Sequence, residues 1–467
     1  MLKLTFSMCL TKKAILAIDV GTTNLKFCIF NGDNCDLLFN QVEEICLINS
    51  KDDQIVEIDP NQLWTQILMM IKNSVAEAEK MNLNIVGIGL SCQRNSFVTL
   101  NRKTLEPCHR IITWKDKRAQ KFCEKWNNSF KRKFLNLIGF AAFTLTRSER
   151  FKAAEMFKLL DVMVAPRFLV TLEENPKMRE LLSTDDLLIA TLDCWILQKL
   201  TNNSQIFVTE PSSASSTGFS LLSLKTDSSL FGKEIQISSC LGDAQAAAFG
   251  AGCFKKGDVN LTLGTGALLD FVTGEEVHAS MCGGVYPLIG WKLDEYSSVY
   301  LLEGLLEQDE DNLCFIPSFS GSEKQNKNGD YSALFGICTN TNKDQITRSI
   351  FKSIVFGIYQ IWTNLLSQLS SNDVRQLKRL RCCGGVSLNN FFCQQICTLI
   401  NIPLERVSEP QFCSAKGVAL LAELWTFDQI EDFIVVERCF EPIYEQRQSL
   451  LRQYNCWLNF QKRFGKF

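Results

Sequence analysis

The chain carries one local pattern twice: a run of apolar residues, a turn rich in glycine and threonine, and a second apolar run. The first copy spans residues 14–30 with its turn at 19–24, and the second spans residues 259–271 with its turn at 264–266. Apolar runs on both sides of a glycine-containing turn are typical of β-hairpins. We interpret the repeat as two related domains that each offer one such turn. Two unrelated hairpins explain the spacing equally well.

Length and element order predict an α/β protein with more than one domain. The chain has 467 residues, which is more than one hydrophobic core supports. Asp59 and Pro60 open a helical pattern, because Asp is a preferred N-cap and Pro a preferred first helical residue. Residues 85–90 then form a buried strand pattern. Alternating strands and helices indicate the α/β class.

The composition is typical of a soluble globular protein, with 46% hydrophobic and 21% charged residues. The formal net charge of −2 provides no basic field over the whole chain for nucleic acid or an anionic membrane surface. No apolar run reaches membrane-spanning length, and the first eleven residues lack the order of a secretory signal. We therefore expect a cytoplasmic protein with no nucleic-acid partner and no membrane segment.

The chain has 20 cysteines and only 2 histidines. The cysteines are scattered, and none forms a Cys-x-x-Cys pair. This pattern disfavours a zinc site and predicts buried free thiols in a reducing compartment.

The two Gly/Thr turns are suited to phosphate, because glycine lets backbone N–H groups approach the oxygens and hydroxyls add donors. The chain lacks the Gly-x-x-x-x-Gly-Lys-[Ser/Thr] motif, so it is not a P-loop protein. Gly87 and Gly89 are not followed by a third glycine that opens a helix, which argues against a dinucleotide site.

Asp243 lies at a predicted turn before a helix and precedes a run of alanines, residues 246–248. An aspartate before a helix is most often a simple N-cap, and the bare motif favours that interpretation. The functional alternative is a general base that takes a proton from a substrate hydroxyl as the hydroxyl attacks a γ-phosphate.

Residues 381–390 predict a strand end, a double glycine and a helix start. Such a turn can hold a nucleotide against the backbone, or it can be an ordinary glycine-rich turn with an Asn cap. Residues 414–425 predict a late helix with small residues, whose spacing allows close packing or close approach of a ligand. The segment after Asp428, with Phe433, Phe440, Tyr444 and Trp457, is expected to pack on the second domain.

Together these pieces resemble the FGGY carbohydrate kinases, and among them the glycerol kinases, in order from residue 14 to residue 425. The segments similar to the family's two phosphate motifs and its adenosine motif are 18–24, 263–266 and 383–390, with 414–417 on the next nucleotide-side helix. The segments similar to the polyol side of glycerol kinases are 93–94 and 114–118. Residues 125–129 and 318–321 resemble the divergent glycerol kinase 5 branch.

The resemblance implies an α/β fold with two actin-like (ribonuclease H-like) domains around a central nucleotide cleft. The N-terminal domain, 13–250, would carry the substrate side and the first phosphate motif. The C-terminal domain, 251–467, would carry the second phosphate motif and the adenosine motif. The implied activity is ATP-dependent phosphorylation of a polyol or sugar, first of all glycerol to glycerol 3-phosphate. ATP and Mg²⁺ are the implied cofactors, and a homo-oligomer is compatible with the family.

The resemblance also implies the roles of individual residues. Asp243 would be the catalytic base and contact the substrate, and Asp19 would hold Mg²⁺ through water. The implied nucleotide contacts are Thr22, Thr23, Asn24, Lys26, Gly264, Thr265, Gly385 and Asn389. The implied substrate contacts are Arg94, Asn95, Trp114 and Asp243.

Four positions depart from the glycerol kinase pattern, and three of them concern the substrate pocket. Lys26 stands for Arg, Asn95 for Glu, Ala244 for Gln and Leu268 for an aromatic residue. A site that binds hydroxyls by hydrogen bonds loses discrimination when those partners change. A kinase for another sugar, a ketose or pentitol, is therefore an alternative to a glycerol kinase.

Two segments, 224–232 and 305–312, are shorter than in the family. Relatives place a helix at the second segment whose Gly and Gln reach the nucleotide phosphates. Phosphoryl transfer depends on positioning and electrostatics, so an open wall there would lower the rate. This leaves a catalytically impaired pseudokinase or binding protein of the same fold as a further alternative.

Overall fold

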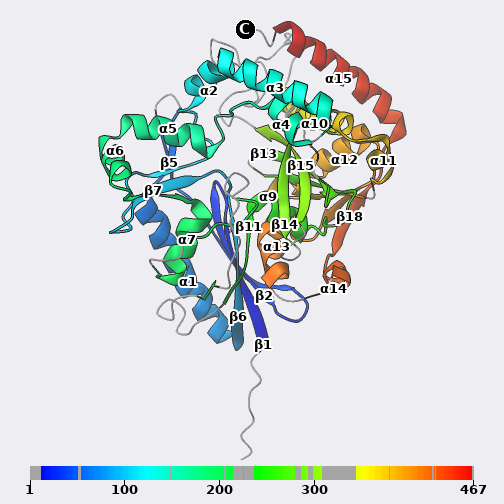
Figure 1. Ribbon diagram of the computed structural model, residues 1–467. Coiled ribbons are helices and arrows are strands. Elements are labelled where there is room, and N and C mark those ends of the chain that lie inside the picture. The colour runs from blue at the N-terminus through cyan, green and yellow to red at the C-terminus, as the bar shows by residue number, and fades with distance from the viewer. Residues whose placement is uncertain are drawn as a thin grey trace, which may run out of the picture.

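The structure is a computed structural model in which the chain forms three sheets with helices packed around them (Figure 1). The described residues are 12–50, 54–147, 149–203, 207–213, 224–225, 236–264, 266–276, 278, 285–292, 298–307, 343–377, 379–422, 425 and 427–464. Of the two segments predicted to be short, residues 308–312 and residues 226–232 lie outside the described residues.

The first half of the chain forms a six-stranded sheet with the order β10-β11-β6-β1-β2-β3. Strand β1 pairs antiparallel with β2 and parallel with β6, and β6 pairs parallel with β11. The strands are β1 (Lys12–Val20), β2 (Asn24–Asn31), β3 (Leu37–Glu44), β6 (Leu83–Cys92), β10 (Leu224–Lys225) and β11 (Gln236–Gly242). The predicted first hairpin and the predicted strand at 85–90 are both present.

The second half forms a seven-stranded sheet with the order β14-β15-β13-β12-β16-β17-β18. Its centre repeats the first sheet, because β12 pairs antiparallel with β13 and parallel with β16. The strands are β12 (Asp258–Leu263), β13 (Gly266–Gly274), β14 (Val285–Lys292), β15 (Ser298–Glu307), β16 (Arg379–Cys383), β17 (Leu404–Val407) and β18 (Val436–Phe440). The second hairpin therefore occupies the same place in its sheet as the first.

A smaller five-stranded sheet belongs to the first half, with the order β4-β5-β8-β7-β9. Its strands are β4 (Leu47–Asn49), β5 (Val56–Ile58), β7 (Phe97–Asn101), β8 (Ile111–Ile112) and β9 (Leu187–Thr191). Helices α2 to α6 follow β8; in Figure 1, α5 and α6 lie at the upper left of the molecule and α3 crosses its top.

The helices of the first half are α1 (Pro60–Lys80), α2 (Gln120–Asn127), α3 (Phe130–Thr146), α4 (Glu149–Met156), α5 (Val164–Glu174), α6 (Pro176–Ser183), α7 (Leu192–Thr201) and α9 (Asp243–Gly250). Those of the second half are α10 (Lys343–Gln368), α11 (Ser371–Arg375), α12 (Asn390–Ile400), α13 (Cys413–Ala422), α14 (Phe427–Asp432) and α15 (Tyr444–Phe464), with 3-10 turns at Gly385–Leu388 and Pro410–Phe412. No helix among the described residues is long and apolar enough to cross a membrane.

Helix α1 begins as its sequence predicts. The Asp59 side chain caps it and accepts hydrogen bonds from the amides of Asn61 and Gln62, with Pro60 at the first helical position. The apolar face of α1 packs into a core that it shares with β1, β2 and β6. This core fixes the hairpin from which the first Gly/Thr turn projects.

Helix α13 comes from the second half of the sequence but packs on β1 and β6 of the first sheet. It also crosses α9 at close range, since a Cβ on Gly417 would overlap the carbonyl oxygen of Ala246. The small residues predicted at 414–425 therefore serve close helix packing, and the helix ends at Ala422.

The C-terminal segment packs on the second sheet's core through Phe440, Tyr454 and Trp457. The expectation is wrong for Tyr444, which is 67% exposed because it occupies the first turn of α15. The 16 described cysteines are free thiols, and most of them are buried.

Candidate active site

A cavity of about 760 Å³ lies between the two Gly/Thr turns and gathers most of the predicted site residues. From the first half it is lined by Asp19, Thr22, Thr23, Asn24, Lys26, Arg94, Asn95, Trp114 and Asp243. From the second half it is lined by Gly264, Leu268, Glu303 and Gly385. Thr265 lies outside the described residues. Asn389 is not among the lining residues: its side chain accepts a hydrogen bond from the Phe391 amide at 3.0 Å and caps α12.

Strand pairing places Asp19 at the end of β1 between two partners. The antiparallel register sets Asp19 opposite Lys26, and the parallel register sets it beside Ser91. Lys26 Nζ lies 3.1 Å from Asp19 Oδ2, and Ser91 Oγ donates to Asp19 Oδ1 at 2.9 Å. Burial disfavours the Lys26 ammonium, but the adjacent carboxylate outweighs it and raises the Lys26 pKa. The turn therefore presents a fixed cation beside a fixed carboxylate.

Arg94 follows β6 and makes an ion pair across the cavity with the second half of the chain. Its NH2 donates to Glu303 Oε2 at 2.5 Å, and Glu303 lies on β15. The Arg94 Nε is buried and has no hydrogen-bond partner among the described residues. A buried donor without a partner is uncommon in folded proteins.

Asp243 is the first residue of α9, and the N-cap of that helix is Gly242. Asp243 Oδ1 accepts from the Ala244 amide at 3.0 Å, and Ser414 Oγ donates to the Asp243 carbonyl oxygen at 3.2 Å. Burial raises the pKa of Asp243 to about 6, against the opposing effect of Arg94 and with a further rise from Asp19. The carboxylate is thus ionised at pH 7 yet close enough to that pH to accept a proton.

Trp114 and Asn95 are both held in place by hydrogen bonds. The Trp114 indole Nε1 donates to Thr22 Oγ1 at 2.8 Å, which ties Trp114 to the first turn. Asn95 adopts a left-handed backbone with φ of 59°, a conformation that Asn tolerates better than most residues. Its carbonyl accepts from Arg167 NH2 at 2.5 Å.

The glycines of the second half leave room for a ligand. No atom lies within 4 Å of the Cβ position of Gly264 or Gly385. Gly384 has a φ of 89°, and a Cβ there would overlap the backbone of Leu263. Glycine at 384 is therefore required by the fold, whereas 264 and 385 border open space at which backbone can approach a phosphate or a nucleotide.

Sequence reasoning missed several residues of the site. Glu303 is an acidic residue in an otherwise apolar strand, and this signal could have identified it. Asp270, its cross-strand neighbour, was open to the same reasoning. Residues 160–165 also line the cavity, but nothing in their composition marks them.

The comparisons with known proteins agree with this geometry. Residues 14–147 match the N-terminal domain, and residues 262–424 the C-terminal domain, of the FGGY family of carbohydrate kinases. Glycerol kinase 5 of Xenopus laevis is 30% identical over 90% of this chain and 98% of its own length, and that of Bos taurus is 31% identical over 88% and 87%. A Plasmodium falciparum glycerol kinase solved with ADP superposes with a TM-score of 0.76 at 18% identity, covering 96% of this chain and 98% of that one. The chain belongs to the FGGY family of carbohydrate kinases.

Proposed function

We propose that this protein transfers the γ-phosphoryl group of ATP to a hydroxyl of a small polyol, with glycerol as the first acceptor to test. The observation that carries the proposal is Asp243, a carboxylate with a pKa of about 6 in a cavity between two phosphate-type turns. The relatives named glycerol kinase and the ADP complex of a glycerol kinase support the choice of acceptor and nucleotide.

Asp243 acts as the general base. As the acceptor hydroxyl attacks, its oxygen forms a bond to the γ-phosphorus and its proton passes to Asp243, while the bond from that phosphorus to the bridging oxygen breaks and ADP leaves. Arg94 lies near enough to oppose the rise in the Asp243 pKa. It thereby keeps the base ionised in the resting enzyme.

The two turns bind the phosphate chain from opposite sides. Thr22 and Thr23 supply hydroxyls and backbone N–H groups, and Lys26 supplies a positive charge from the first turn. Gly264 supplies backbone with open space in front of it. Fixed donors of this kind stabilise the charge on a transferring phosphoryl group without reorganising.

Asp19 fits the role of a Mg²⁺ residue. Each of its oxygens already accepts one hydrogen bond, from Ser91 or Lys26, which leaves lone pairs for the water around a hydrated ion. When bound with the nucleotide, Mg²⁺ neutralises charge on the phosphate oxygens.

The acceptor is held by Arg94, Asn95 and Trp114. The Arg94 guanidinium supplies hydrogen-bond donors in the cavity lining, and the indole ring of Trp114 provides an apolar wall. Leu268 lines the same cavity and makes no hydrogen bond through its side chain. These residues are compatible with glycerol, and a ketose or pentitol remains the alternative acceptor because its hydroxyls would meet the same donors.

The decisive experiment is an ADP-release assay with Mg-ATP and a panel of glycerol, pentitols and ketoses. The Asp243→Asn variant is expected to lose at least about a thousandfold in kcat and to keep its affinity for ATP. The matched control is Asp428→Asn on the exposed face of α14, which should have wild-type activity. Equal rates for Asp243→Asn and wild type would overturn the assigned base. ATP binding without turnover on any acceptor in the wild type would indicate a pseudokinase.

A further inference from the structure

Helix α3 exposes a continuous apolar face to solvent. The positions 130, 134, 137, 138, 141 and 145 share one side of a helix. The exposed large apolar residues of α3 are Phe130, Phe134, Leu135, Leu137, Ile138, Phe140 and Leu145. Phe130 is 80% and Leu145 is 85% exposed, so both ends of the face are open to solvent. Apolar patches of this extent on a soluble protein mark an interaction site.

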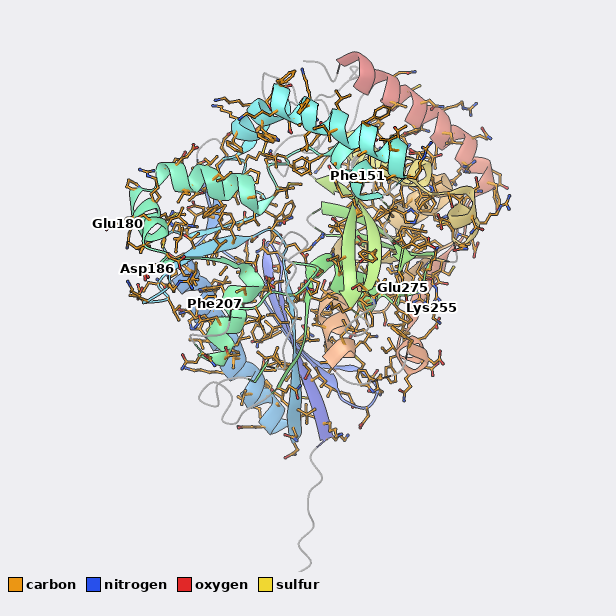
Figure 2. The ribbon with its side chains drawn as sticks, viewed as in Figure 1. Phe151, Glu180, Asp186, Phe207, Lys255 and Glu275 are labelled. Carbon is orange, nitrogen blue, oxygen red and sulfur yellow. The ribbon has the colours of Figure 1, made fainter. Side chains whose placement is uncertain are left out.

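The opposite side of α3 accounts for its packing within the molecule. A Cβ on Gly139 would overlap the backbone of Glu155 in α4, so the two helices touch at that point. Asn136 Nδ2 donates to the carbonyl oxygens of Ala154 at 2.9 Å and Glu155 at 2.5 Å. The apolar face therefore points away from α4. In Figure 1 α3 runs along the upper rim of the molecule, and Figure 2 places Phe151 of α4, also exposed, just below α3.

The charges of α3 are all positive. The helix contains Lys131, Arg132 and Lys133 and no acidic residue, although the whole chain has a formal net charge of −2. Helical geometry puts Lys131 at one border of the apolar face and Lys133 at the other, and both are exposed. Basic residues that flank an apolar face are typical of helices that lie in the interface of an anionic membrane.

We propose that α3 binds an anionic lipid surface, lying in the plane of the interface with Phe134, Leu137 and their neighbours among the acyl chains. A second copy of the chain is the alternative occupant of this face, and a dimer that depends on α3 is the outcome that would identify it. The proposal agrees with the absence of a membrane-spanning helix among the described residues, since an interfacial helix does not cross the bilayer. It does not depend on the kinase activity, because α3 contributes no residue to the cavity.

The test is co-sedimentation of the full chain with vesicles of phosphatidylcholine alone or with about one quarter phosphatidylserine. We expect at least about tenfold tighter binding to the anionic vesicles, weakening as salt is added. Phe134→Ser with Leu137→Ser should reduce binding at least about tenfold through lost apolar contact. The matched control, Met69→Ser with Leu182→Ser, changes two exposed apolar residues outside α3 and should bind like wild type.

Charge is tested separately. Lys131→Glu with Lys133→Glu should lose about tenfold or more in binding. Lys72→Glu with Lys177→Glu makes the same change in net charge on α1 and α6 and should have little effect. An unchanged melting temperature and an unchanged circular-dichroism spectrum in every variant show that the fold is intact. The proposal is overturned if neither vesicle binds, if the control pairs weaken binding as much, or if the α3 variants instead abolish a dimer seen by sedimentation.

Discussion

Arg94 and Glu303 form an ion pair that joins the two halves of the chain across the cavity, with 2.5 Å between Arg94 NH2 and Glu303 Oε2. Both side chains are largely buried, so removal of either charge leaves the other without compensation. The pair therefore fixes Arg94, for which we propose a contact with the acceptor, by means of the second half of the chain.

The first prediction concerns this ion pair. Glu303→Ala should destabilise the protein by about 3–5 kcal/mol, because it leaves a buried guanidinium unpaired. Glu303→Gln keeps an acceptor oxygen and should cost less, while raising the acceptor KM more than the ATP KM. Thermal unfolding and steady-state kinetics measure both effects. An equal rise in the two KM values would contradict a role in acceptor positioning.

The second prediction concerns pH. Asp243 has a pKa of about 6, and only its ionised form accepts a proton, so kcat/KM should fall as pH drops below about 6. The Asp243 carboxyl affects the stability of the folded state in the opposite direction: low pH lowers activity but favours folding. A carboxyl whose pKa is raised by folding stabilises the folded state at low pH, and this contribution is lost as pH rises through 6. Asp243→Asn should therefore melt at a higher temperature than wild type at pH 8, but not at pH 4. A lower melting temperature for the variant at pH 8 would contradict this.

The third prediction separates two buried aspartates on neighbouring strands. Burial, and then repulsion from Glu303, raises the pKa of Asp270 well above its usual range, so the fold disfavours the charged form of this carboxyl. Asp270→Asn should then leave stability at pH 7 within about 1 kcal/mol. Asp258 instead lies 3.0 Å from the Arg379 guanidinium. Asp258→Asn should cost roughly 2 kcal/mol or more, because it weakens a buried ion pair. Urea unfolding of both variants measures the contrast.

The fourth prediction contrasts two glycines. Gly385 borders open space in the cavity, so Gly385→Ala should raise the KM for ATP several-fold and leave the melting temperature unchanged. Gly417→Ala would drive a methyl group into the Ala246 carbonyl and should destabilise the protein by about 1–3 kcal/mol. Loss of stability in the Gly385 variant would show that this glycine serves the fold and not the nucleotide.

The sequence predicts best what is encoded locally. The two hairpins and the cap of α1 depend on residues close together in the chain, and all of them are present. The simple N-cap interpretation of Asp243 is wrong, because Gly242 holds that position. The role of Asn389 at the nucleotide stays a prediction, since its side chain caps α12.

The sequence does not reveal contacts between residues that lie far apart in the chain, because these contacts depend on how the strands are aligned in the sheet. Glu303 reaches Arg94 because β15 pairs with β13 in one alignment, which brings together residues that are 209 positions apart. Tyr444 and Trp457 are both large aromatic residues of α15. Only Trp457 lies on the side of the helix that packs on the core of the second sheet. Neither the Arg94–Glu303 contact nor the burial of Trp457 can be predicted from the residues next to them in the sequence.

The placement of α13 also has a consequence for biosynthesis. The first sheet is made of residues 12–242, but the helix that covers Ala17 and Gly89 is contributed by residues 413–422. During translation the N-terminal half emerges first, and this face of its sheet stays bare until nearly the whole chain has left the ribosome. A nascent chain that stops short of residue 413 would therefore expose the apolar face of the first sheet. We expect such a chain to bind chaperones and not to fold as an independent N-terminal domain.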